Sequence, residues 1–195
     1  MDLAHNQIHT VDPTGRAFVA QKNLHLLDLS HNHLEILGHQ TLTGLDVLHT
    51  LSLEHNKLHS MHPSSLTNCT VAIQELTLNN NFLTEIPKAV HFLGSLRSLD
   101  LSANLIGVLK RESLQGLPKL KALKISQNEL SRYDYQLHPL PKIIGYDILI
   151  RIVLQIKTDL KFTDKIRYFD ELEKKIKIKF TGISELDLSF QLKMM

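Results

Sequence analysis

The stretch Leu27–Leu37 reads LDLSHNHLEIL and places one asparagine, Asn32, inside a comb of regularly spaced leucines. Leu27 and Leu29 alternate with Asp28, which predicts a short strand with the leucines on one face and the aspartate on the other. Asn32 follows where the chain should turn. Because its amide can both donate and accept hydrogen bonds, we expect it to satisfy backbone groups that the turn leaves unpaired.

The comb recurs along the first two thirds of the chain. Its other copies are DLAHNQIHTV from Asp2, LSLEHNKLHSM from Leu51, LTLNNNFLTEI from Leu76, LDLSANLIGVL from Leu99 and LKISQNELSRY from Leu123. The aligned asparagines, which we expect to stack as a structural ladder, are Asn6, Asn32, Asn56, Asn81, Asn104 and Asn128. Their steps of 26, 24, 25, 23 and 24 residues indicate a solenoid of stacked repeats.

A further apolar position recurs six or seven residues before the first leucine of each strand. Its members are Phe18, Leu42, Leu66, Val90 and Leu114. This spacing predicts short helical or 3-10 turns on the convex side of the solenoid, opposite a concave sheet whose strands pair in parallel from repeat to repeat.

The pattern L-x-x-L-x-L-x-x-N-x-L over residues 1–133 resembles the leucine-rich repeat family. The repeat length of about 24 residues and the ending LTEIP are similar to those of the family's extracellular class. This class includes Toll-like receptors, chaoptin-like adhesion proteins and matrix proteoglycans. The resemblance implies an α/β fold, a right-handed leucine-rich-repeat solenoid with a curved parallel sheet. It also implies non-catalytic protein recognition by a secreted or cell-surface receptor or adhesion protein, with an intracellular scaffold or regulator as the alternative. The cysteine-rich caps of extracellular members are missing, which indicates a fragment or ends capped in another way.

The period breaks after Tyr133. Residues 144–183 are rich in isoleucine and lysine, and removing them restores a step of 23 residues from Asn128 to Gln191. We therefore divide the chain into a repeat array (1–143), an irregular or helical insert (144–183) and a degenerate seventh repeat (184–195). Two explanations of the insert stay open: a real insertion in which IRYFDELEKKIKIKF forms an amphipathic helix, and translated non-coding sequence, the hypothesis that we favour.

Charge and targeting signals narrow the function classes. The formal net charge is +2, without a Lys/Arg cluster interleaved with aromatics, so we expect no nucleic-acid binding. No secretory signal is visible, and the longest apolar run, residues 143–156, is shorter than the roughly 20 residues of a membrane span, so we expect no transmembrane segment in this chain. The sequon at Asn68 is a candidate glycosylation site and favours an extracellular or cell-surface location for the full-length protein, with a cytoplasmic one as the alternative.

The strand positions that face away from the core predict the binding surface. Five repeats carry an acidic residue there, and the sixth carries Lys124 instead, so the concave face should be mildly acidic and favour a basic protein ligand or co-receptor. The candidate ligand-binding residues are Asp28, His31, Ser52, Glu54, His55, Glu75, Thr77, Asn79, Asp100 and Lys124. The first repeat begins without a cap, so the sheet edge at Asp2 could pair with another chain in self-association.

Histidines suggest two further hypotheses. His5, His31 and His55 each precede a ladder asparagine and should stack about 4.8 Å apart, which would make a pH-sensitive patch unless they are simply solvated residues at a variable position. The H-x₃-H spacing of His5 and His9 suggests a metal, but outside a helix such residues do not share a face, so we expect no metal and no cofactor. We also expect no enzyme, with a histidine- or metal-dependent hydrolase as the competing class.

Overall fold

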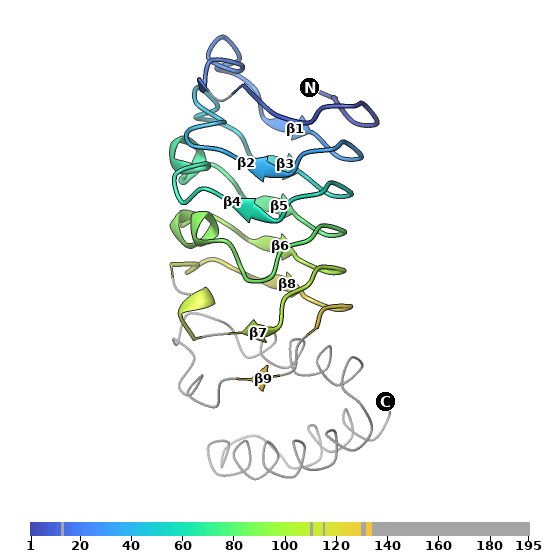
Figure 1. Ribbon diagram of the computed structural model, residues 1–195. Coiled ribbons are helices and arrows are strands. Elements are labelled where there is room, and N and C mark those ends of the chain that lie inside the picture. Colours follow the sequence, from blue (N-terminus) through green and yellow to red (C-terminus); the bar gives the residue numbers. More distant parts are fainter. Residues whose placement is uncertain (13, 110, 115, 130–131, 134–195) are drawn as a thin grey trace. The chain divides into compact units, whose positions relative to one another are not determined.

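The computed structural model describes residues 1–12, 14–109, 111–114, 116–129 and 132–133. Within them, five short strands form one parallel sheet in the order β1, β3, β5, β6 and β8, so each strand pairs with that of the next repeat (Figure 1). These strands are β1 Leu26–Asp28, β3 Thr50–Ser52, β5 Glu75–Thr77, β6 Ser98–Asp100 and β8 Ala122–Lys124. The predicted solenoid of parallel strands is confirmed.

The return half of each repeat carries shorter elements. Two-residue strands pair as β2 with β4 and as β7 with β9; they are β2 Ile36–Leu37, β4 Ser60–Met61, β7 Val108–Leu109 and β9 Arg132–Tyr133. The helical elements of the described residues are all 3-10 helices, namely η1 Thr67–Cys69, η2 Lys88–Phe92 and η3 Arg111–Leu114. The predicted insert at 144–183 and the degenerate repeat at 184–195 lie outside the described residues.

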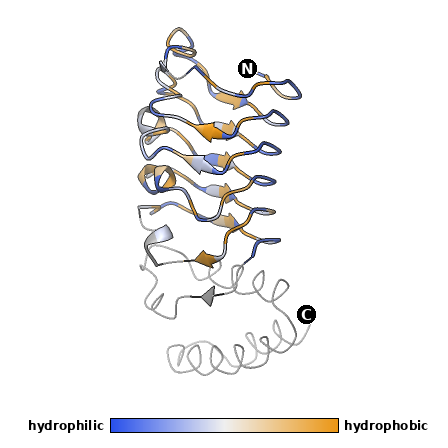
Figure 2. Ribbon diagram, viewed as in Figure 1, coloured by the Kyte–Doolittle hydropathy of each residue, from blue (hydrophilic) through white to orange (hydrophobic). Residues whose placement is uncertain are grey.

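The core consists of the leucine comb. The second repeat is typical: Leu27, Leu29, Leu34 and Leu37 have at most 1% of their surface exposed, while Leu24 stays partly exposed. The recurring convex position is buried as well, at Phe18, Leu42, Leu66, Val90 and Leu114. In Figure 2, hydrophobic and hydrophilic colours both occur along the strands, and hydrophilic colour prevails at the turns that follow them.

The asparagine ladder is held together through the backbone. The amide nitrogen Nδ2 of Asn56 donates to the carbonyl of Leu29 in the preceding repeat at 2.9 Å and to the carbonyls of Leu53 and Glu54 at 3.1 and 3.2 Å. Its Oδ1 accepts the N–H of Leu34 at 3.0 Å. The same pattern recurs at Asn32, Asn81, Asn104 and Asn128. Each of these asparagines therefore fixes the turn of its own repeat and joins it to the preceding one.

Candidate functional site

The strand register sorts the outward side chains of the concave sheet into rows. One row, which we call the central row, consists of Asp28, Ser52, Thr77, Asp100 and Lys124. The row beside it consists of Leu26, Thr50, Glu75, Ser98 and Ala122. Half of the predicted ligand-binding residues thus come together in the central row, whereas Glu54 and Asn79 lie two residues beyond their strands. The acidic residues are consequently spread over several rows and do not form one line.

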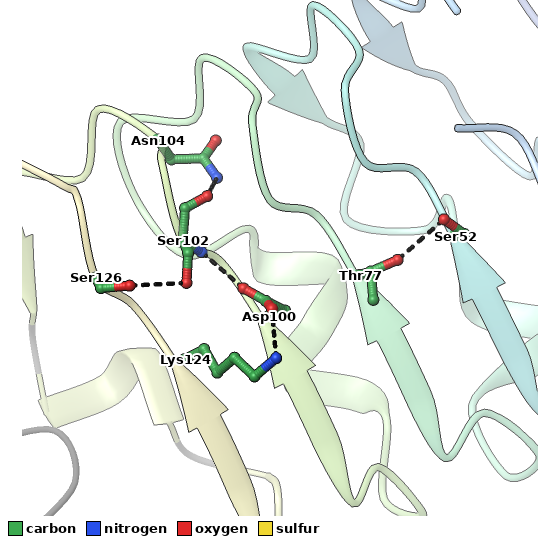
Figure 3. A network of polar contacts seen from close by, with 7 residues as sticks. All are labelled: Ser52, Thr77, Asp100, Ser102, Asn104, Lys124 and Ser126. Carbon is green, nitrogen blue, oxygen red and sulfur yellow. Dashed lines mark hydrogen bonds and ion pairs between the residues drawn. The ribbon is translucent and has the colours of Figure 1, made fainter. Parts of the chain in front are cut away.

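Short polar side chains contact one another across this sheet (Figure 3). Thr77 Oγ1 donates a hydrogen bond to Ser52 Oγ at 3.1 Å, and Ser126 Oγ donates one to Ser102 Oγ at 3.2 Å. All four residues are partly exposed. Because these side chains are short and hold each other in place, the concave face presents hydroxyl groups whose positions are set before any partner arrives.

The carboxylates of the central row also bond to the sheet. Asp28 Oδ1 accepts the N–H of Ser30 at 2.9 Å, and Asp100 Oδ1 accepts that of Ser102 at 3.0 Å. Asp100 Oδ2 also lies 3.1 Å from Lys124 Nζ (Figure 3). Partial burial alone would raise the pKa of the Asp28 carboxyl, but hydrogen bonds from Ser30 and Ser52 hold that pKa below its ordinary value. Asp28 therefore stays charged at neutral pH.

The residue before each ladder asparagine adopts a left-handed backbone. Its φ lies between 52° and 56° at His5, His31, His55, Asn80, Ala103 and Gln127. Few residues other than glycine adopt this conformation, and histidine and asparagine are among those enriched in it. Since the same turn repeats in every coil, the side chains leave the backbone in the same direction, one above the other.

The predicted stacking of the histidine column, His5, His31 and His55, is confirmed. The ring centroids of His5 and His31 lie 4.1 Å apart with the planes 11° from parallel, and those of His31 and His55 lie 4.3 Å apart at 10°. The column continues to Asn80, whose Nδ2 lies 3.3 Å from Nε2 of His55. The distances between the histidine ring centroids are thus shorter than the distance of about 4.8 Å expected between neighbouring strands.

A further row was missed by the sequence reasoning. We call it the pre-strand row; its members are His25, His49, Gln74, Arg97 and Lys121, one residue ahead of the five strands. Strict alternation along a strand would turn these side chains inward, yet Arg97 and Lys121 are exposed. The reason is a doubled pairing: the carbonyl of Gln74 accepts the N–H groups of both Arg97 and Ser98, at 2.8 and 3.0 Å, as at a β-bulge.

The same doubled pairing occurs between every pair of neighbouring strands in the sheet. The carbonyl of His25 accepts from His49 and Thr50, and the carbonyl of Arg97 accepts from Lys121 and Ala122. At the start of the row, Nδ1 of His25 lies 3.0 Å from Nδ1 of His49, so one ring can donate to the other. The sequence signal that could have found this row is the polar residue after the first leucine of L-x-x-L-x-L, which is basic or histidine in four of the five repeats.

The convex side carries Cys69 and the predicted sequon. Cys69, at the end of η1, is a free thiol that is buried and therefore not accessible to an outside partner. The same burial raises the pKa of this thiol to about 12. Asn68 lies within the same short helix. Among the described residues no group of three or more potential ligands could hold a metal ion. Within that part of the chain, no helix has the length and apolar character needed to cross a bilayer.

Comparisons with known proteins agree with this geometry. The profile of the leucine rich repeat family matches residues 1–58, 46–106, 71–130 and 94–143, so the chain belongs to this family. It is 34% identical to podocan-like protein 1 of Mus musculus over 132 residues, covering 67% of this chain and 22% of that protein. It is 30% identical to osteomodulin of Rattus norvegicus over 166 residues, covering 74% and 39% respectively.

Two further comparisons found one more curated relative and one solved structure. Toll-like receptor 3 of Bos taurus is 31% identical over 141 residues, covering 66% of this chain and 15% of the receptor. Among solved structures, the TLR13–ssRNA13 complex matches with a TM-score of 0.37 and 21% identity, covering 66% of this chain and 25% of that one. The chain thus spans less than two fifths of the length of each curated relative named here.

Proposed function

We propose that this chain is a non-catalytic protein-recognition module of a secreted or cell-surface receptor or adhesion protein, and that its concave sheet binds a protein ligand. The single observation that carries the proposal is the difference between the two faces of the sheet. One face supplies the leucines of the core, while the other presents short polar side chains already held by hydrogen bonds. Membership of a repeat family whose named relatives include a Toll-like receptor and osteomodulin supports it.

Charge supports a basic partner for the concave face. Glu75 is exposed in the row beside the central row, and Asp28 and Glu54 are partly exposed. Complementary charges steer association, so basic groups of a ligand would be favoured over these repeats. Among the described residues, the ion pair between Asp100 and Lys124 neutralises the C-terminal end of the central row.

Site-specific photocrosslinking tests the binding face. A benzoyl-phenylalanine replaces Ser98 or Thr50 on the concave sheet, or Val71, whose side chain is 79% exposed outside the sheet, as the control position. The full chain is then exposed to extracellular proteins of the source tissue under ultraviolet light. We expect protein adducts from the two concave positions and not from the control. Adducts of equal yield from Val71, or none from the concave positions, would contradict the proposal.

The extracellular location has a separate test at Asn68. If the chain passes through the secretory pathway, its sequon should carry an N-linked glycan, because such glycans are added there. Mass spectrometry of the protein isolated from its own cells should show a mass decrease after enzymatic deglycosylation, with Asn68→Gln as the control that carries no glycan. A chain with an unmodified Asn68 in those cells would favour the intracellular scaffold.

A further inference from the structure

The pre-strand row forms a continuous strip along the margin of the sheet. The N–H of Arg97 donates to the carbonyl of Gln74 and that of Lys121 donates to the carbonyl of Arg97, both at 2.8 Å. Successive members therefore lie on neighbouring strands, about 4.8 Å apart, and five positions span about 19 Å. Each repeat of the sheet contributes one side chain to this strip.

The chemistry of the strip is that of hydrogen-bond donors. Arg97 and Lys121 are exposed cations, and within the described part of the chain neither is paired with a carboxylate, since the ion pair found there joins Asp100 and Lys124. Gln74 and the two histidines continue the row with side chains that can also donate hydrogen bonds. The row has no acidic member. A partner that offers a series of acceptors, and above all negative ones, fits the strip.

Neighbouring side chains favour an acidic peptide over a denser polyanion. Glu75 directly follows Gln74 and is exposed, and Asp46, also exposed, lies three residues before His49. A nucleic acid or sulfated polysaccharide would bring unbroken negative charge against these carboxylates. The rings of the row are those of His25 and His49, which contact each other, and at Gln74, Arg97 and Lys121 the row has no ring on which a base could stack. An extended peptide can direct acidic side chains at alternate positions to one face and keep neutral residues elsewhere.

We propose that the pre-strand row binds an extended acidic segment of a protein partner, which lies across the strands with its carboxylates on Arg97 and Lys121. At about 3.3 Å per residue, roughly six residues of such a segment cover the strip. That the partner is a protein rests on the proposed function. The sign of its charge follows from the row itself.

Fluorescence anisotropy with two peptides tests this inference. The probe is a fluorescein-labelled peptide of about eight alternating glutamate and serine residues, titrated with the full chain at low ionic strength. The double variant Arg97→Gln/Lys121→Gln should weaken binding about fivefold or more, as expected for the loss of two exposed charge contacts. The matched control Lys22→Gln/Lys57→Gln removes two exposed cations outside the row and should change affinity less than about twofold.

The outcomes separate the two proposals. Equal weakening by both double variants would show general charge attraction and overturn the inference, as would tighter binding of heparin or of a single-stranded oligonucleotide than of the peptide. A second peptide of alternating lysine and serine probes the concave face instead, with Asp28→Asn/Glu75→Gln as its variant. If the wild-type chain does not bind the basic peptide, or if this variant binds it unchanged, the acidic charge expected for the concave face is contradicted and the proposal for the pre-strand row is unaffected.

Discussion

A single backbone angle decides where the histidine column points. The residue before each ladder asparagine has φ near +55°, and this turn gives every repeat the same exit direction for its side chain. At His5, His31 and His55 the result is a stack of rings, whereas Ala103 at the same position contributes only a methyl group. The residue type thus varies on a fixed backbone, which is the condition under which a surface position can acquire a binding role.

Gly44 illustrates the opposite case, a residue that the backbone dictates. Its φ is +92°, and an added Cβ would lie 2.7 Å from Cα of Val19 in the neighbouring coil. We expect Gly44→Ala to lower the free energy of unfolding by about 2 kcal/mol or more, measured by urea denaturation. Gly94→Ala is the control, because its Cβ would meet nothing within 4 Å, and it should cost less than about 1 kcal/mol. Equal effects would refute this account of the close approach.

His91 should make stability depend on pH. Burial and then the charge of Lys88 lower its pKa, and its Nε2 is buried without a hydrogen-bond partner in the described structure. The unfolded chain therefore takes up this proton at a higher pH than the folded chain. The stability that neutral His91 contributes is present above about pH 6.5 and is lost as the pH falls through the lowered pKa.

Thermal unfolding of the wild-type protein and His91→Gln between about pH 7.5 and pH 5 measures this effect. We expect the wild type to lose more stability on acidification than the variant, which has no proton to take up at this position. The other histidines are common to both proteins and cancel in the comparison. Parallel pH profiles of the two proteins would show that His91 is not the group responsible.

Among the elements, the turn after each strand depends most on one side chain. Asn56 is buried and bonds to backbone groups of two repeats, whereas Asn6 is exposed and donates to the carbonyls of Leu3 and Ala4 in its own repeat. We expect Asn56→Ala to cost roughly 3 kcal/mol or more, since several buried backbone groups lose their partner, and Asn6→Ala about 1 kcal/mol. Urea denaturation of both variants measures the difference, and similar costs would argue against a ladder that joins repeats.

The elements also show which features a sequence can predict. Periodicity alone gives the strands, the leucine core, the ladder and the stacked histidines, because each depends on one position repeated in every coil. The pre-strand row was missed because alternation assigns Arg97 and Lys121 to the inner face, and only the doubled pairing of carbonyls between strands turns them outward. Likewise, the spacing of Asp28, Glu75 and Asp100 indicates acidity but cannot assign them to rows or pair Asp100 with Lys124.

Over residues 1–133, the acidic and basic side chains are unevenly distributed between the N-terminal and the C-terminal repeats. Residues 1–62 hold six acidic residues against three basic ones, and residues 63–133 hold eight basic against five acidic. Ten of the 12 histidines lie in residues 1–62, and five contacts between histidine rings join its coils. Because imidazoles gain a proton in mildly acidic solution, acidification adds positive charge to the very repeats that are negative at neutral pH.

This asymmetry predicts that a basic ligand is released from the N-terminal repeats on acidification. Positive charge added to the histidine column should weaken binding of the lysine–serine peptide about threefold between roughly pH 7.5 and pH 5.5, a modest change because rings stacked 4.1 and 4.3 Å apart resist simultaneous protonation. The triple variant His5→Gln/His31→Gln/His55→Gln should lose most of this pH dependence and keep its affinity at neutral pH. His39→Gln/His59→Gln/His62→Gln is the matched control, since these residues lie outside the column, and it should behave as the wild type. If the peptide binds equally at both pH values, or if the control abolishes the pH dependence as fully as the column variant does, the histidine column does not regulate the concave face.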